Sequence, residues 1–221
     1  MTALLQARGL HTHYGQSHIL RGIDFTVGQG QTIGLMGRNG MGKTTLLKSL
    51  MGIVKPSGGG VLIKGRPMTG ASTFEIAREG IAYVPEGRGI FGNLSVRENL
   101  VMAARPGLDG QQDWTFDKVL ATFPRLAERL GNLGAQLSGG EQQRVAIARA
   151  FAAQPAVLFA DEPTGNLDSH TGERISDLLF DLNKERGTTL VLVTHDERLA
   201  RRCRRQIRLD AGRLVAPMEA R

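Results

Sequence analysis

The feature that most constrains this chain is a glycine-rich octapeptide, Gly37-Arg38-Asn39-Gly40-Met41-Gly42-Lys43-Thr44. The strand-like stretch 31–36 precedes it, and residues 44–51 follow it with leucines at helical spacing. The pattern G-x-x-x-x-G-K-[ST] between a strand and a helix predicts a loop whose backbone N–H groups bind phosphate oxygens. Lys43 is expected to reach the β- and γ-phosphates, and Thr44 to bind Mg²⁺. The simpler alternative is a glycine-rich structural turn.

A pair of acids follows an apolar run in the last third of the chain. Residues 157–160 are all apolar, which is typical of a strand buried on both faces. Asp161 and Glu162 come next. Asp161 is expected to hold Mg²⁺, and Glu162 to act as the general base toward water. The alternative is an ordinary turn at the strand end, because Asp-Glu-Pro also favours turns.

A second glycine motif, Leu137-Ser138-Gly139-Gly140-Glu141-Gln142-Gln143, lies between these two elements. Ser138 is expected to cap a helix, and the glycines let the backbone approach an anion closely. The motif therefore predicts a second phosphate site. The residues themselves do not explain why one chain has two.

Composition narrows the function classes. The 28 basic and 21 acidic side chains leave a net charge of +7, which is compatible with nucleic acid, an anionic membrane surface or phosphate ligands. Aromatic residues are only 5%, so platforms for stacking single-stranded bases are scarce. The single Cys203 excludes an internal disulfide and a cysteine zinc site and fits a reducing compartment. No secretory signal and no run of about 20 apolar residues is visible. The late arginines are expected to lie on a solvated helix face.

Periodicity predicts alternating strands and helices at both ends of the chain, with a helix-rich insertion between them. Strands are expected at 3–9, 19–27, 31–36, 61–63, 81–85, 157–160, 188–194 and 206–209. Helices are expected at 44–51, 96–104, 113–130, 140–153 and 171–186, with another after residue 194. Loops are expected at 56–60 and 106–113. Ser95 and Glu98 form a candidate capping box.

The whole chain resembles the nucleotide-binding subunits of ABC transporters. It contains their motifs in their usual order: the Walker A loop 37–44, the LSGGEQQ stretch 137–143, the Walker B strand that ends in Glu162, and His195. The resemblance implies an α/β P-loop NTPase with a mixed sheet, an N-terminal antiparallel β subdomain and an inserted helical subdomain. It implies one domain, 1–221, with a RecA-like core (1–85 and 154–221) and a helical signature subdomain (86–153). It also implies Mg²⁺-dependent ATP hydrolysis in a head-to-tail homodimer or heterodimer, on integral membrane permease subunits at the cytoplasmic membrane face.

The same resemblance implies further site residues. Tyr14 matches the aromatic that stacks on adenine, Asp168 ends a D-loop, and His195 matches the switch histidine. Glu86 stands where the family usually has glutamine. Its carboxylate can still bind Mg²⁺ or hold a water, but it adds negative charge near the phosphates. The expected catalytic residues are Lys43, Glu162 and His195, and the expected metal ligands are Thr44, Glu86 and Asp161. The expected nucleotide-binding residues are Tyr14, Gly37, Arg38, Asn39, Gly40, Met41, Gly42, Lys43, Thr44, Thr45, Ser138, Gly139, Gly140, Glu141 and Asp168.

The two halves resemble different subfamilies. Residues 1 to about 135, with HYGQSHIL and GIAYVPEGRGIFGNLSVREN, are similar to the smaller ATPase of branched-chain amino acid importers. From about Gln142, QRVAIARA, DEPTGNLD and VTHD resemble lipoprotein-release and macrolide-export ATPases. We therefore hypothesise a recombined or fused chain. Amino acid import is the first expectation and an export-type ATPase the alternative. Two rivals are a nucleic-acid ATPase without a transport role, although no nucleic acid is expected, and a module that binds ATP but hydrolyses it poorly.

Overall fold

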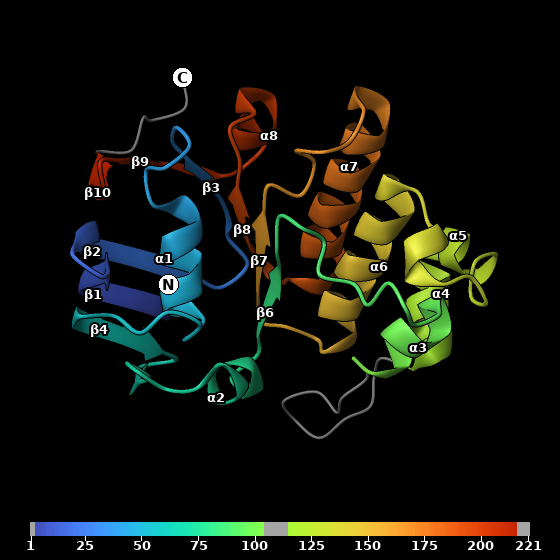
Figure 1. Cartoon of the computed structure of the whole chain (residues 1–221), viewed down its shortest axis with the longest axis horizontal. Helices are drawn as coiled ribbons and strands as arrows, with labels where there is room; N and C mark the ends of the chain where they lie inside the picture. The colour runs from blue at the N-terminus through green and yellow to red at the C-terminus, as the bar shows by residue number, and fades with distance from the viewer. Residues whose placement is uncertain (1–2, 104–114, 216–221) are drawn as a thin grey trace.

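A computed structural model describes residues 3–103 and 115–215. It is an α/β structure with two sheets (Figure 1), so the predicted fold class is confirmed. The first sheet is antiparallel, with strand order β2-β1-β4-β5. Its strands are β1 (Ala3–Tyr14), β2 (Ser17–Gly28), β4 (Gly58–Ile63) and β5 (Arg66–Pro67).

The second sheet has the strand order β10-β9-β3-β8-β7-β6 and is parallel except for β10, which pairs antiparallel with β9. Its strands are β3 (Thr32–Met36), β6 (Ile81–Val84), β7 (Val157–Asp161), β8 (Thr189–Val193), β9 (Arg205–Asp210) and β10 (Arg213–Val215). Parallel strands end at the same edge of a sheet. The loops that follow β3, β7 and β8 are thereby brought together.

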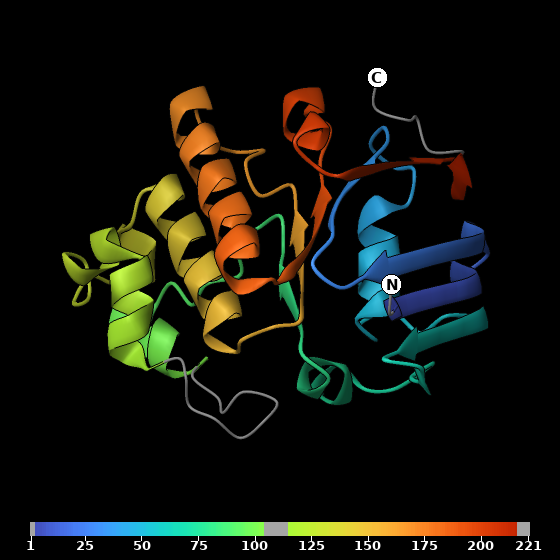
Figure 2. The ribbon, with the colours of Figure 1, turned by 180° about the vertical axis from the view of Figure 1, so that it is seen from behind.

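Helices lie on both sides of the mixed sheet (Figures 1 and 2). They are α1 (Lys43–Leu50), α2 (Thr73–Arg78), α3 (Val96–Val101), α4 (Phe116–Thr122), α5 (Pro124–Ala127), α6 (Gly139–Ala152), α7 (Ser169–Arg186) and α8 (Glu197–Arg201). The central strand β8 shows how the two cores form. Val191 and Val193 join the core with α1 and the antiparallel sheet, whereas Leu190 and Leu192 join the core with α6 and α7. Side chains alternate along a strand, so an unbroken apolar run supplies both cores.

Several boundaries differ from the sequence prediction. The expected strands 3–9 and 19–27 are longer, and β1 runs to Tyr14, because they form one hairpin closed by a two-residue turn. The expected loop 56–60 is partly strand β4 because Gly58 and Gly60 pair with β1. A Cβ on Gly59 would lie 2.1 Å from the Gly9 carbonyl oxygen, so glycine is required for this close pairing.

The helical prediction for 113–130 was wrong at its centre. Two short helices, α4 and α5, replace one, because Pro124 has no N–H and disfavours helix at Phe123, whose ψ is 62°. Ser95 caps α3 in the predicted capping box with Glu98. Strands β5 and β10 and helix α2 were not predicted. Residue 104, the whole of the expected break at 106–113 and residue 114 lie outside the described residues.

Within the described ranges, none of the helices has the length and apolar character needed to span a bilayer. The division into a core (1–85 and 154–221) and a helical subdomain (86–153) stays a prediction.

Candidate active site

The glycine loop connects β3 to α1 through backbone conformations that other residues rarely adopt. Gly40 and Gly42 have φ angles of +80° and +102°, in the region that favours glycine. At Gly37, a Cβ would lie 2.4 Å from the Leu209 carbonyl oxygen of β9. The glycines therefore allow the loop to turn tightly against the sheet before α1 begins.

Lys43 is the first residue of α1, and its side chain is buried and folds back over the preceding loop. Its Nζ donates hydrogen bonds to the Gly37 carbonyl oxygen at 2.7 Å and to the Arg38 carbonyl oxygen at 3.1 Å. Two carbonyl groups thus hold the ammonium over the loop. The positive end of the α1 dipole adds to the positive potential there.

Asp161 ends β7 and is fully buried. Its Oδ2 accepts a hydrogen bond from the Tyr83 hydroxyl at 3.1 Å. Its Oδ1 has no hydrogen-bond partner in 3–103 or 115–215. Burial raises the pKa of this carboxyl. The hydroxyls of Thr44 and Tyr83 oppose the rise, the negative charge of Glu86 adds to it, and the positive charge of Lys43 opposes it.

Glu162 has a φ of +46°, which is uncommon for a residue with a side chain. Its N–H donates to the Val193 carbonyl oxygen at 2.9 Å, so the strained backbone is fixed to the end of β8. Holding this conformation costs about 1 kcal/mol. Strain of this kind concentrates at functional sites, where the surrounding structure maintains it.

The Glu162 carboxylate faces His195, the second residue after β8. The distance from His195 Nδ1 to Glu162 Oε2 is 2.9 Å. This oxygen nevertheless has no well-directed hydrogen bond in the part of the chain that is described. The His195 side chain is 65% exposed and that of Glu162 only 11%. The imidazole is therefore free to turn toward a ligand, whereas the carboxylate is held in the protein wall.

These elements enclose a cleft of about 450 Å³. It is lined by Ile19, Asn39, Gly40, Gly42, Lys43, Thr44, Thr45, Glu86, Asp161, Glu162, Gly165, Asn166 and His195. All three expected catalytic residues and all three expected metal ligands belong to this set. The loop lysine and the paired acids, 118 and 119 positions apart in sequence, thus meet at one edge of the mixed sheet.

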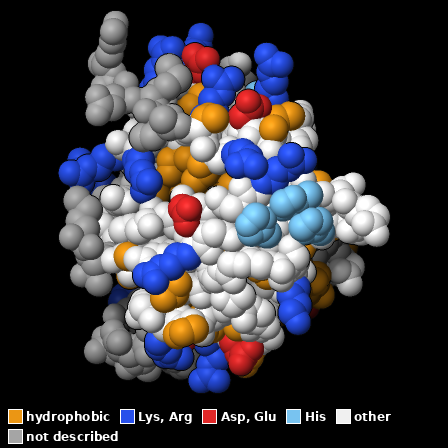
Figure 3. Space-filling model, turned by 90° about the vertical axis from the view of Figure 1, so that its left-hand side faces the viewer, with side chains coloured by type: hydrophobic (Ala, Val, Ile, Leu, Met, Phe, Trp, Pro, Cys, Tyr) orange, Lys and Arg blue, Asp and Glu red, His pale blue; other side chains and the backbone are white. Residues whose placement is uncertain are grey.

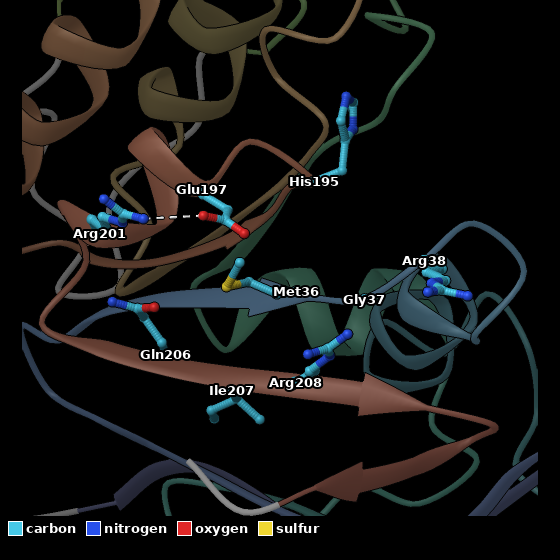
Figure 4. A pocket seen from close by; sticks show the side chains of 9 residues that line it. All are labelled: Met36, Gly37, Arg38, His195, Glu197, Arg201, Gln206, Ile207 and Arg208. Atoms are coloured by element: carbon cyan, nitrogen blue, oxygen red, sulfur yellow. Dashed lines mark hydrogen bonds and ion pairs between the residues drawn. The ribbon is translucent and has the colours of Figure 1, made fainter. Parts of the chain in front are cut away.

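A second cleft, of about 410 Å³, lies beside the glycine loop (Figure 4). It contains Gly37 and Arg38 of the loop, while His195 lines both clefts. An ion pair of 3.1 Å between Arg201 and Glu197 occupies one side of it. Neither Asp161 nor Glu162 lines this cleft. The first cleft, which holds both acids, is therefore the candidate reaction site.

Some expected site residues lie elsewhere. Tyr14 ends β1 and is 47% exposed. The Met41 sulfur accepts a hydrogen bond from the Ala211 N–H at 3.3 Å. Asp168 caps α7 by accepting from the Thr171 N–H at 2.9 Å, and it lines another cleft.

The Ser138–Glu141 stretch begins α6 and also lies outside the candidate cleft. Ser138 and Glu141 form a capping box, as the expected cap required. Hydrogen bonds from Ser138 lower the pKa of the Glu141 carboxyl, and Arg129, 2.9 Å away, lowers it further. A Cβ on Gly140 would lie 2.5 Å from Thr171 Cγ2, so this glycine lets α6 pack closely against α7.

Two features of the site escaped the sequence analysis. One is the hydrogen bond from the Tyr83 hydroxyl to Asp161. It could have been predicted only from the pairing of β6 with β7, which places the ends of these two strands side by side. The other joins the loop after Glu86 to α6. Arg88 donates to Gln142 Oε1 at 2.8 Å, and Arg149 donates to the Gly89 carbonyl oxygen at 2.6 Å. Both contacts are long-range in sequence and leave no local pattern.

Comparisons with known proteins agree with this geometry. The family model described as ABC transporter matches residues 20–165. The "Uncharacterized ABC transporter ATP-binding protein YbbA" of Escherichia coli (strain K12) is 46% identical over 200 residues, which cover 89% of this chain and 88% of YbbA. The lipoprotein-releasing system ATP-binding protein LolD 1 of Caulobacter vibrioides is 36% identical, with 98% and 96% covered.

Among solved structures, the dimeric bacterial ABC transporter cassette MJ0796 superposes with a TM-score of 0.84 at 30% identity, covering 98% of this chain and 99% of the cassette. A dimeric post-hydrolysis state of the same cassette, bound to ADP and Pi, gives a TM-score of 0.83 at 31% identity, covering 98% and 99%. The chain therefore belongs to the ABC transporter family, as an ATP-binding subunit.

Proposed function

We propose that this chain is a Mg²⁺-dependent ATPase that supplies free energy to a membrane permease. One observation carries the proposal: Lys43, Thr44, Asp161, Glu162 and His195 line the same cleft, although they come from three separate parts of the sequence. The ADP and Pi found in the post-hydrolysis MJ0796 cassette support the same chemistry.

The residues of the cleft fit a magnesium ion. Asp161 Oδ1 is buried and lacks a hydrogen-bond donor within the described ranges, and such an oxygen needs a compensating partner. Thr44 and Glu86 add hard oxygen ligands to the same cleft. We assign Thr44 and Asp161 as metal ligands, with Glu86 at the edge of the set. When bound, Mg²⁺ would neutralise phosphate charge.

The protein side chains divide the hydrolysis between them. Lys43 and the N–H groups of the glycine loop bind the β- and γ-phosphates. Glu162 takes a proton from a water molecule while the oxygen of that water bonds to the γ-phosphorus. The bond between the γ-phosphorus and the β,γ-bridging oxygen breaks, which releases ADP and inorganic phosphate. His195, exposed and next to Glu162, contacts the γ-phosphate. The roles of Tyr14 at adenine and of the loop residues, including Arg38, Asn39 and Thr45, belong to the same proposal.

We further propose that the cassette works as a head-to-tail dimer. Residues Ser138–Glu141 and Asp168 do not line the cleft of their own chain. A second copy would supply the serine-glycine helix start to the bound triphosphate. The dimeric state of MJ0796 supports this arrangement.

The permease is expected to contact a groove of about 780 Å³ between α2, β6, α3 and α6. Phe74 and Met102, which line it, are 58% and 56% exposed, although both are large apolar side chains. Large exposed apolar groups in a groove are typical of a protein–protein contact. This contact would place the chain on the cytoplasmic face of a membrane.

For the transported substrate, we propose the lipoprotein-release or export class rather than import of branched-chain amino acids. Import was the first expectation because residues 1 to about 135 resemble the smaller ATPase of branched-chain amino acid importers. The LolD relative, which matches over nearly the whole chain, carries the name of a lipoprotein-releasing system and so supports the alternative. The junction between two parental types near Gln142 stays a hypothesis.

The central test is Glu162→Gln. We expect steady-state hydrolysis to fall by about a hundredfold or more, because the general base is lost. With MgATP, size-exclusion chromatography is expected to show a stable dimer. Glu185→Gln, an exposed change in α7, is the matched control and should leave both readouts unchanged.

Three outcomes would refute parts of this proposal. Normal turnover in Glu162→Gln would remove Glu162 as the base. Very slow hydrolysis by the wild type, with tight ATP binding, would favour the nucleotide-binding module that hydrolyses poorly. Salt-sensitive binding of the purified chain to DNA or RNA would favour the nucleic-acid ATPase.

A further inference from the structure

The second cleft, the hollow of about 410 Å³ beside the glycine loop, has an excess of positive charge (Figure 4). Its charged lining consists of Arg38, Arg201 and Arg208 with one acid, Glu197, and His195 adds an imidazole. Arg201 is already paired with Glu197 at 3.1 Å. Two arginines therefore have no compensating acid among the described residues that line the cleft.

The register of the mixed sheet explains why these groups meet. Strands β3 and β9 are parallel, and Met36 stands opposite Arg208. Gln206 and Arg208 are two residues apart on β9, so both project from the same face. Figure 4 shows them on the side of β9 that faces β3 and α8, whereas Ile207 points the other way, into the core. The cleft is thus enclosed by two strands, the glycine loop and α8.

The guanidinium groups of Arg38 and Arg208 are free to bind a ligand. Neither forms an ion pair or a hydrogen bond within the described ranges. Arg38 lines this cleft and not the first one, although its carbonyl oxygen accepts from Lys43 Nζ at 3.1 Å. A guanidinium presents five N–H donors in a planar fork that matches the oxygens of a phosphate. The cleft therefore combines charge and donors suited to an oxyanion.

Charged side chains are arranged differently elsewhere on the surface. On the face shown in Figure 3, Lys and Arg side chains are spread out, and Asp and Glu side chains lie among them. Such a mixture of signs is the usual solvated exterior of a protein. In the second cleft, by contrast, charges of one sign surround a hollow, and the protein walls there strengthen the local field.

We propose that the second cleft binds a phosphate-bearing anion, separately from the triphosphate in the first cleft. Arg38 and Arg208 would donate charge-assisted hydrogen bonds to the phosphate oxygens, and the Gln206 amide would add a neutral donor. A volume of about 410 Å³ lies within the size range of small-molecule sites. The phosphoryl group belongs either to inorganic phosphate or to a phosphorylated small molecule.

His195 connects this site to the candidate active site, because it lines both clefts. Its Nδ1 now lies 2.9 Å from Glu162 Oε2, and its side chain is exposed enough to turn. An anion in the second cleft would attract the imidazole away from Glu162 and from the γ-phosphate. Bound phosphate is therefore expected to slow hydrolysis without displacing ATP. This consequence rests on the proposed function, whereas the binding itself does not.

The test is a calorimetric titration of inorganic phosphate into the full chain at low ionic strength, with excess ATP and EDTA. ATP then fills the glycine loop and is not hydrolysed, so the added phosphate binds elsewhere. One phosphate per chain is expected, and NaCl should weaken its binding because salt screens exposed charges. A parallel titration with AMP distinguishes the sources. Tighter binding of AMP than of phosphate would assign a phosphorylated organic ligand, and binding no tighter than that of phosphate would assign the inorganic ion.

Arg208→Gln should weaken phosphate binding by about tenfold or more, because it removes a charged fork. Arg208→Lys keeps the charge without the fork and should lose less. Arg213→Gln is the matched control: it changes an exposed arginine of the neighbouring strand β10 that does not line the cleft, and it should bind phosphate as the wild type does. Cooperative thermal unfolding establishes that each variant is folded.

Steady-state hydrolysis at saturating MgATP tests the connection through His195. Added phosphate should lower the kcat of the wild type and inhibit Arg208→Gln about tenfold less effectively, while Arg208→Gln without phosphate should hydrolyse ATP as the wild type does. Binding without inhibition would overturn the connection to His195. A chain that fails to bind ATP would refute the proposed function, and the comparison of the arginine variants would still decide the anion site. No phosphate binding by the wild type, unchanged affinity in Arg208→Gln or an equal loss in Arg213→Gln would overturn that site.

Discussion

Removing the Tyr83 hydroxyl tests how the buried acid at the end of β7 is held. Tyr83→Phe keeps the ring but removes the donor 3.1 Å from Asp161 Oδ2. Asp161 is fully buried, and its other oxygen already lacks a hydrogen-bond partner within the described residues. A hydrogen bond to a charged group contributes about 1.5–3 kcal/mol. We therefore expect the free energy of unfolding to fall by about 2 kcal/mol at pH 7.

The pH dependence identifies the cause of this loss. Burial raises the folded-state pKa of Asp161 above its ordinary value of 3.8, and removing the hydroxyl raises it further. The folded state then takes up a proton before the unfolded state does. Stability is thus lost above the folded-state pKa and recovered as pH falls through it. The cost of Tyr83→Phe should accordingly be full at pH 7 and shrink toward pH 4.

Urea denaturation at both pH values, in the absence of nucleotide, measures this difference. Tyr14→Phe is the matched control, because Tyr14 is the only other tyrosine and is 47% exposed. Its change should stay within about 0.5 kcal/mol. An equal cost of Tyr83→Phe at pH 7 and pH 4 would show that the hydroxyl does not act through the charged carboxylate.

Three further outcomes are expected. Gly140→Ala should lower the free energy of unfolding by about 1–3 kcal/mol in urea denaturation, because its Cβ would lie 2.5 Å from Thr171. Gly131→Ala, with open space around the new Cβ, is the control and should be nearly neutral. Equal costs in the two variants would contradict close packing at Gly140. The folded-state pKa of His18 lies below the ordinary value of 6.5, so on acidification the unfolded chain binds a proton first and the melting temperature should fall. His18→Gln should make the melting temperature less sensitive to acid. A larger acid sensitivity in this variant would contradict a lowered pKa for His18. Burial raises the pKa of the Cys203 thiol to about 12, so iodoacetamide at pH 8 should label it only after unfolding, and rapid labelling of the native chain would show an open site.

The sequence predicted best those elements that have a local physical cause. The glycine loop predicted a strand before it and a helix after it, and β3 and α1 lie at these positions. The apolar run 157–160 predicted a strand buried on both faces, and β7 is fully buried. The Ser95 cap followed from spacing alone.

What could not be predicted depends on contacts between distant segments. The strand at Gly58–Gly60 exists only because β1 lies beside it. The Tyr83–Asp161 contact joins residues 78 positions apart. Glu162 follows β7 with a left-handed backbone that its residue type does not suggest. Such features arise from the packing of the whole chain, which a local pattern does not encode.

The two arginine contacts between α6 and the loop after Glu86 have a mechanical consequence. Arg88 donates a hydrogen bond to Gln142 of α6, and Arg149 of α6 donates one to the Gly89 carbonyl oxygen. Gln142 and Arg149 are seven residues apart on the helix, which is about 10 Å at 1.5 Å per residue. A segment fastened at two separated points cannot pivot about either one. A displacement of residues 88–89 should therefore carry α6 with it as one body, and Ser138 at the N-terminal end of α6 would move with the helix.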